Sequence, residues 1–128
     1  MKKPVLVVLS LIWILVANAQ TGSILERTKL ALKSANSQQL GQLMGEKITL
    51  GFDGEAGSLA AREAEKRMDS FFKSHPVVDL SQLFQGQSKD GKQYFIGVLK
   101  TKGGDYRVSV YWVEAPKVQL LSIDFSKE

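Results

Sequence analysis

The pattern of apolar and polar positions is clearest in the C-terminal third of the chain, where short apolar runs alternate with turn-forming residues. The runs are rich in β-branched and aromatic residues, which is typical of strands. Connections as short as Lys102-Gly103-Gly104-Asp105 predict that neighbouring strands pair antiparallel, in a meander. The predicted strands are Leu83–Gly86, within a less regular apolar stretch that begins at Val77, then Tyr94–Thr101, Tyr106–Glu114 and Val118–Phe125.

The first half of the chain shows the spacing of amphipathic helices. Ser23, with Glu26 three residues later, predicts a capping box at the start of the first helix. Ser58 is expected to cap the longest helix, and Pro76 to end it. The three predicted helices are Thr21–Asn36, about Asn36–Gly45, and Ser58 to about Ser74.

One further strand is predicted between the second and third helices. Lys47–Phe52 alternates apolar and polar residues, and Asp53–Gly57 after it is rich in turn formers, which indicates a loop. The same alternation assigns the side chains of the later strands to two faces. The face expected to pack on the helices consists of Phe95, Leu99, Val108, Val110, Trp112, Leu121, Ile123 and Phe125.

The N-terminus has the three parts of a secretory signal peptide. Met1-Lys2-Lys3 is basic, Val5–Val16 is almost wholly apolar, and Ala17-Asn18-Ala19 is an A-x-A cleavage site. The apolar run has about a dozen residues, whereas a spanning helix needs roughly 20. We therefore expect cleavage before Gln20, a secreted or periplasmic protein, and no membrane span after cleavage.

Composition changes this picture little. Cleavage after residue 19 leaves 109 of the 128 residues as one domain, residues 20–128, which is enough for a single hydrophobic core. Loss of Lys2 and Lys3 lowers the number of basic residues from 17 to 15, against 13 acidic ones. Such a balance does not indicate nucleic-acid binding. The chain has no cysteine, so disulfides and lipid attachment through a cysteine are excluded.

The order of these elements resembles the nuclear transport factor 2-like, or cystatin-like, cone. Within that fold the chain is similar to a family of short secreted bacterial proteins of unknown function. The resemblance implies an α+β fold in which a helical hairpin and one long helix fill the concave side of a strongly curved antiparallel sheet. It is carried by the signal peptide, the helix with Ala64, Met68, Phe71 and Phe72, the stretch Gln85–Gly97, and Tyr106-Arg107-Val108.

The wider fold includes ketosteroid isomerases, polyketide cyclases and dehydratases, so the resemblance also raises an enzymatic alternative. An isomerase-type site needs a carboxylate base in an apolar cavity and a donor that faces the developing oxyanion. Asp79, Tyr106 and Trp112 are the ligand-pocket candidates. A turn or cap role competes for Asp79, and a core role competes for the two aromatic residues.

No residue is assigned as catalytic from the sequence. His75 stands at the end of the long helix, where its charge would suit the helix C-terminus, and no carboxylate pairs with it in the pattern. One histidine, no cysteine and no clustered acids predict neither a metal site nor a cofactor.

The other face of the sheet is predicted to be half apolar. Monomers seldom expose such a patch, and proteins of the resembled fold commonly dimerise sheet to sheet, so a homodimer is expected; an ordinary sheet surface is the alternative. The interface candidates are Tyr94, Ile96, Val98, Arg107 and Tyr111, with Lys100, Val113, Leu120 and Asp124 around them.

These patterns favour an exported, non-enzymatic domain. We expect it to bind a partner, such as an envelope protein, or a small apolar ligand, either in the cone or on the outer sheet face. The alternative is an isomerase- or cyclase-like enzyme with a carboxylate and a tyrosine in the cone pocket. An open cavity with an inward carboxylate would distinguish the two functions.

Overall fold

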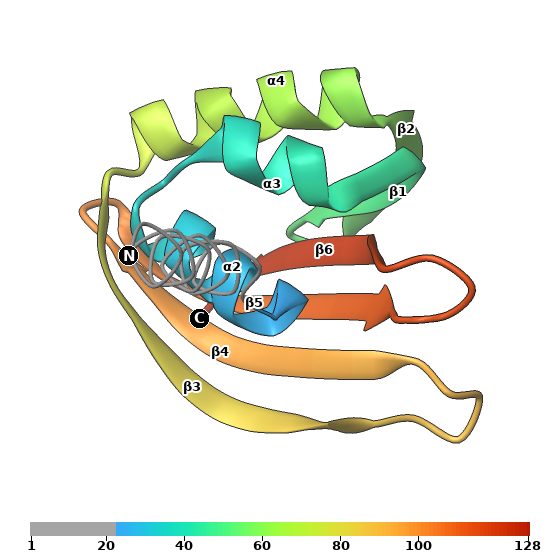
Figure 1. Cartoon of the computed structure of the whole chain (residues 1–128). Coiled ribbons are helices and arrows are strands. Elements are labelled where there is room, and N and C mark those ends of the chain that lie inside the picture. The colour runs from blue at the N-terminus through green and yellow to red at the C-terminus, as the bar shows by residue number, and fades with distance from the viewer. Residues whose placement is uncertain (1–22) are drawn as a thin grey trace, which may run out of the picture.

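The computed structural model describes residues 23–128, so the predicted signal peptide and its cleavage site before Gln20 lie outside the described residues. Three helices cover the concave side of a six-stranded sheet that curves around them (Figure 1). This is the α+β architecture that the sequence predicts. The elements are α2 (Ile24–Lys33), α3 (Ser37–Leu43), β1 (Met44–Phe52), β2 (Glu55–Ala60), α4 (Ala61–Ser74), β3 (Val77–Gln87), β4 (Gln93–Thr101), β5 (Gly104–Val113) and β6 (Gln119–Lys127).

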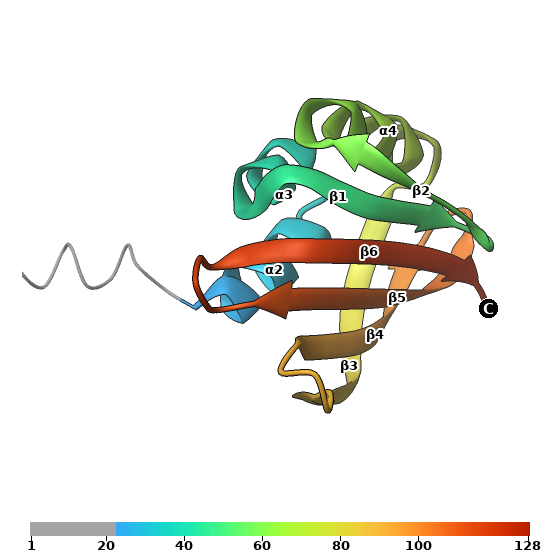
Figure 2. The same cartoon turned by 90° about the vertical axis from the view of Figure 1, so that its right-hand side faces the viewer.

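The strand order is β2-β1-β6-β5-β4-β3, which Figure 2 shows from the side of β5 and β6. Strands β3 to β6 form the predicted antiparallel meander. Strand β1 pairs with β6 in parallel, with Leu50 opposite Ile123, and the sequence patterns did not predict this pairing. Two hydrogen bonds at Asp53 extend the junction: its N–H donates to the Phe125 carbonyl at 2.7 Å, and its carboxylate accepts from the Lys127 N–H at 2.7 Å.

The segment 53–60 was predicted wrongly as a loop followed by a helix cap at Ser58. It is instead a two-residue turn and strand β2, which pairs antiparallel with β1. Asp53 and Gly54 have φ values of 51° and 89°, as both central residues of a tight hairpin turn require. The Asp-Gly pair after an alternating strand was therefore a hairpin signal. Helix α4 begins three residues later than Ser58, and its N-cap Ala60 makes no side-chain hydrogen bond.

The predicted faces of β6 need one correction, because Leu120 is buried and Leu121 is only half buried. Tyr111 pairs with Ser122 while Trp112 pairs with Leu120, so Leu121 is an extra residue in a β-bulge. A bulge reverses the alternation of faces along the strand. Leu120 therefore belongs to the core and not to the outer face, whereas Ile123 and Phe125 are buried as predicted.

Several element boundaries also differ from the sequence predictions. Helix α2 begins after Ser23, whose hydroxyl accepts from the Glu26 N–H at 3.1 Å, but it ends at Lys33, before the predicted end. Gly45 does not stop a helix, because α3 ends at Leu43 and β1 has already begun at Met44. Strand β3 is longer than predicted and continues through two register shifts, one between Val77 and Asp79 and one between Gln82 and Phe84.

The core lies between the helices and the concave face of the sheet. Helix α4 buries Ala64, Met68 and Phe72 in it. Phe71 is half buried, and its ring lies 4.5–5.8 Å, centre to centre, from five others. We call this group the aromatic cluster; it consists of Phe52, Phe71, Phe72, His75, Tyr106 and Phe125.

Candidate functional site

The concave side of the sheet, where the resemblance led us to expect a cone pocket, is filled by side chains. All the core residues of the strands are buried, and those with no exposed surface are Phe95, Leu99, Val108, Val110, Leu120, Ile123 and Phe125. No Asp or Glu of residues 23–128 is buried. The described part of the chain therefore lacks the buried carboxylate that an isomerase-type base requires.

Asp79 lies at the rim of the molecule and not in the cone. Its side chain is 56% exposed, and its carboxylate accepts a hydrogen bond from the Leu80 N–H at 2.8 Å. The Lys33 ammonium stands 3.8 Å away. Asp79 thus has the turn or cap role that was the alternative to a catalytic one: its carboxylate accepts from the next backbone N–H.

Tyr106 is buried, and its hydroxyl lies 3.2 Å from His75 Nε2. His75 Nδ1 lies 3.0 Å from the Phe71 carbonyl, which can only accept, so Nδ1 must donate. In the neutral imidazole, Nε2 then accepts from the Tyr106 hydroxyl. This chain of two hydrogen bonds ties the end of α4 to β5, a structural use of both side chains that the sequence patterns did not reveal.

Trp112, the third pocket candidate, is also buried. Its neighbours across the strands are Gln93 and Leu120. Its indole N–H has no hydrogen-bond partner within the described part of the chain. The structure thus brings Tyr106 and Trp112 into one packed layer and leaves Asp79 outside it.

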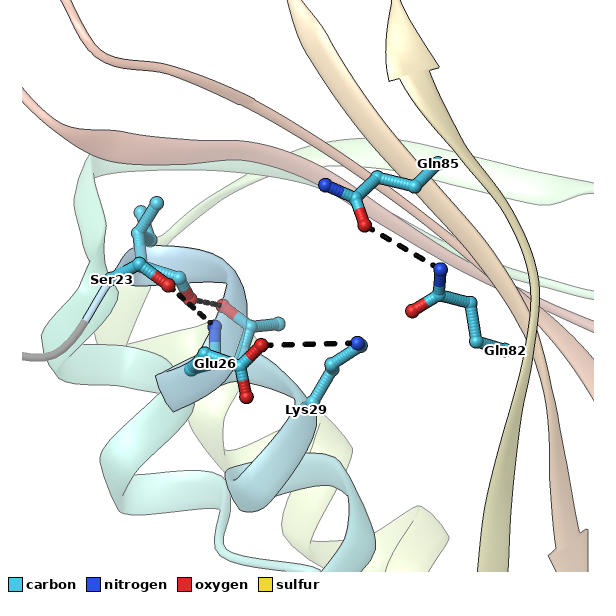
Figure 3. Close-up of polar contacts among 7 residues, drawn as sticks. Ser23, Glu26, Lys29, Gln82 and Gln85 are labelled. Carbon is cyan, nitrogen blue, oxygen red and sulfur yellow. Dashed lines mark hydrogen bonds and ion pairs between the residues drawn. The ribbon is translucent and has the colours of Figure 1, made fainter.

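A groove of about 270 Å³ remains between α2 and β3, at the mouth of the filled cone. Its floor is Phe95, and Lys29 Nζ stands 5.6 Å from the centre of that ring. Lys29 also pairs with Glu26 at 4.0 Å, and Figure 3 shows Lys29 reaching from α2 toward Gln82 on β3. Gln82 is held in turn by a 3.5 Å hydrogen bond from its amide to Gln85. The groove is smaller than the roughly 300–1,000 Å³ of most small-molecule pockets.

The outer face of the sheet carries the predicted interface residues close together. Tyr94 and Tyr111 are cross-strand neighbours with ring centres 5.7 Å apart, and Val98 lies opposite Arg107. Phe84 of β3, which the sequence analysis did not include, stands beside Ile96 and is 59% exposed. Simple alternation along β3 would place Phe84 on the concave face. The register shift at Leu83 places it on the outer face instead, opposite Ile96. We define the outer patch as Phe84, Tyr94, Ile96, Val98 and Tyr111.

A family profile for a domain of unknown function, DUF4783, matches residues 25–126. The chain belongs to this family. None of the curated proteins searched matches it significantly.

Solved structures of DUF4783 proteins are similar along most of their length. A protein from Bacteroides uniformis shares 29% identity, with a TM-score of 0.76 over 83% of this chain and 98% of that one. One from Bacteroides ovatus shares 27%, with a TM-score of 0.74 over 80% and 93%. A Catenulispora acidiphila protein described as having a ketosteroid isomerase-like fold, solved with trimethylamine, shares 14%, with a TM-score of 0.61 over 84% and 87%. The last likeness concerns the fold alone, and it supports the predicted cone.

Neither a metal centre nor a membrane helix is found in the part of this DUF4783 protein that the structure describes. Residues 23–128 contain no group of three or more histidine, aspartate or glutamate side chains placed to hold a metal ion. None of the helices in the same range is long and apolar enough to cross a membrane.

The turn between β3 and β4 is held by a dense set of hydrogen bonds. The Ser88 N–H donates to the Lys92 carbonyl at 2.7 Å, and the Gly91 N–H donates to the Ser88 carbonyl at 3.1 Å. The Ser88 hydroxyl is bonded to the Asp90 carboxylate, which also pairs with Lys92 Nζ at 3.3 Å. The hydrogen bond from Ser88, followed by the contacts with Lys92, lowers the pKa of the Asp90 carboxyl below its ordinary value.

We expect this turn to loosen in acid. A lowered pKa means that the charged carboxylate favours the folded turn, so its contribution is complete above the unfolded pKa of about 3.9 and is lost as the pH falls through the lowered value. Carbon-13 NMR titration should place the Asp90 pKa below 3.9. Ser88→Ala should raise that pKa most, and Lys92→Gln should raise it less. A wild-type pKa at or above 3.9 would contradict the assignment.

Proposed function

We propose that this DUF4783 protein is an exported, non-enzymatic module that binds a protein partner through the outer patch. The predicted signal peptide supports export, and the filled concave side of the sheet supports binding elsewhere than in the cone. Three of the five large apolar residues that are exposed in residues 23–128 lie on β3: Val78, Leu83 and Phe84. The observation that carries the proposal is Phe84, which stands exposed beside Ile96 in the outer patch.

A second copy of the chain is the first partner to test. A two-fold contact brings the same surface of both copies together, so that surface must complement itself. Two charged residues lie around the outer patch. Arg107 of β5 lies opposite Val98, and Asp124 of β6 lies opposite Ser109. Charges of both signs beside an apolar centre allow a two-fold arrangement in which each Arg107 faces the other copy's carboxylate.

The test is the mass of residues 20–128 and of two matched variants, measured by native mass spectrometry and light scattering. Phe84→Glu places a charge in the outer patch, whereas Val118→Glu alters a side chain of nearly equal exposure, 57% against 59%, in the connection before β6. An unpaired charge in an interface costs about 3 kcal/mol or more, which is over a hundredfold in affinity. We therefore expect a wild-type dimer, a folded Phe84→Glu monomer and a Val118→Glu dimer.

Other outcomes are equally informative. A dimer that survives Phe84→Glu would remove the outer patch as the contact between copies. A wild-type monomer at high micromolar concentration would remove the second copy as the partner. An envelope protein would then be the occupant to seek, by crosslinking from a photoreactive residue placed at position 84.

A further inference from the structure

The outer face of the sheet has a second zone, which overlaps the outer patch at Tyr94 and Tyr111, in which hydroxyl groups are aligned across the strands. Thr49 of β1 lies opposite Ser58 of β2 on one side and Ser122 of β6 on the other. Ser122 lies opposite Tyr111 of β5, which in turn lies opposite Tyr94 of β4. We call these five residues, Ser58, Thr49, Ser122, Tyr111 and Tyr94, the hydroxyl row.

The row faces outward as a whole. The residues that flank its members along their strands, such as Leu50, Ile123 and Val110, are buried on the concave side. Because side chains alternate along a strand, all five row members point away from the helices. Five strands about 4.8 Å apart place the outermost members roughly 19 Å from one another. Gly86 continues the row on β3, and the Tyr94 hydroxyl occupies the space beside it, 2.8 Å from where a β-carbon at position 86 would lie.

A hollow of about 650 Å³ lies over the middle of the row. Its floor includes Thr49, Ser122 and Tyr111, and its wall is the turn between β3 and β4. The hydrogen bonds described above fix that turn, so the wall is already in place before any ligand arrives. A preformed wall lowers the entropy cost of binding.

The charge of the wall is positive. It carries Lys89, Asp90 and Lys92, and the Asp90 carboxylate is already used by Ser88 and by Lys92 at 3.3 Å. Lys89 forms no ion pair within residues 23–128. Its ammonium group remains available to a negative charge above the row.

We propose that the hydroxyl row and this wall form a binding site for an acidic oligosaccharide. Each hydroxyl can donate one hydrogen bond and accept two, which matches the mixed donors and acceptors of a sugar. The tyrosine rings offer apolar surfaces on which the C–H faces of sugars can pack. Lys89 supplies the partner for a carboxylate. A peptide is a poorer match, because β1, β6 and β5 under the hollow are each paired on both sides and cannot accept an added strand.

The hydroxyl row shares Tyr94 and Tyr111 with the outer patch, so a contact between copies through that patch would cover part of the sugar site. Phe84 is outside the row, so the Phe84→Glu monomer should bind the oligosaccharide at least as well as the wild type. Failure of dimerisation and failure of sugar binding are therefore distinguishable in the same set of proteins.

The test is calorimetric titration of residues 20–128 with tetrasaccharides of galacturonic acid, mannuronic acid and hyaluronan, and with methyl-esterified tetragalacturonate as the neutral control. We expect at least one acidic tetrasaccharide to bind, and its neutral or reduced-charge form to bind about tenfold more weakly or worse. Lys89→Glu should lower the affinity at least about tenfold, whereas Lys102→Glu, in the turn at the other end of β4, should leave it unchanged.

A second variant separates sugar recognition from charge alone. Thr49→Val combined with Tyr111→Phe removes two hydroxyls, keeps the shape of both side chains and leaves the lysines in place. We expect it to weaken binding about tenfold with unchanged thermal stability. The proposal is overturned if no acidic tetrasaccharide binds at millimolar concentration. It is also overturned if a short polyphosphate binds as well and this double variant has no effect, because attraction to charge would then explain the binding.

Discussion

Replacing Phe71 by alanine is expected to lower the free energy of unfolding by about 3–5 kcal/mol, the range for loss of a large aromatic ring from a packed site. Phe71 is only half buried, yet its ring touches every other member of the aromatic cluster. The closest are His75, stacked at 4.5 Å, and Phe125 at 4.9 Å. The substitution therefore removes the closer of two aromatic contacts between α4 and Phe125, the other being Phe72 at 6.2 Å, together with the stacking partner of the His75 ring.

Chemical denaturation monitored by circular dichroism measures this loss. Leu30→Ala is the matched control, because Leu30 is 69% exposed on α2 and its removal should change stability by no more than about 0.5 kcal/mol. A loss below about 1 kcal/mol for Phe71→Ala would show that the aromatic cluster does not hold α4 on the sheet.

Gly97→Ala is expected to destabilise the protein by about 2–3 kcal/mol although it adds a single methyl group. A β-carbon at position 97 would lie 2.5 Å from the Ser81 carbonyl oxygen and 2.8 Å from the ring of Phe95. The carbonyl belongs to the paired backbone of β3 and cannot turn aside, and the ring has no free volume because Phe95 is fully buried. The glycine is therefore required where β4 bends against the bulge of β3.

Gly57→Ala provides the control for this second substitution. Gly57 lies in β2, and a β-carbon there would meet no atom within 4 Å. Alanine at position 57 should be neutral, or stabilising by up to about 1 kcal/mol, because it restricts the unfolded chain. Equal effects at positions 57 and 97 would exclude crowding against Ser81 as the cause.

Much of the fold could be predicted because its signals are local. Alternation in β4 and β5 predicted which residues are buried, among them Phe95 and Val108, and the short turns predicted the meander. The failures have local causes too. The bulge at Leu121 shifts the alternation by one residue, and the residue types around it do not predict such a shift. The parallel pairing of β1 with β6 joins segments about 70 residues apart in the chain. Local hydrophobic periodicity cannot predict which distant strands pair.

The candidate sites were harder to predict than the fold. Asp79 and Tyr106 were chosen by residue type, but the structure places them apart, because the direction of a side chain depends on register and on helix packing. The outer face was predicted from alternation, and its members Tyr94 and Tyr111 are indeed neighbours. Phe84 and the hydroxyl row emerge only when the registers of all six strands are combined.

Because β6 lies between β1 and β5, the six-stranded sheet can form only after β6 has been synthesised. The hairpin of β1 and β2 and the meander of β3 to β5 touch through β6, and β6 is synthesised after every other strand. Closing so long a segment is slow compared with forming a hairpin. A nascent chain should therefore hold two unjoined pieces of sheet until residues 119–127 arrive. Without these residues the sheet cannot form, so a chain that stops before the end of β6 should not fold.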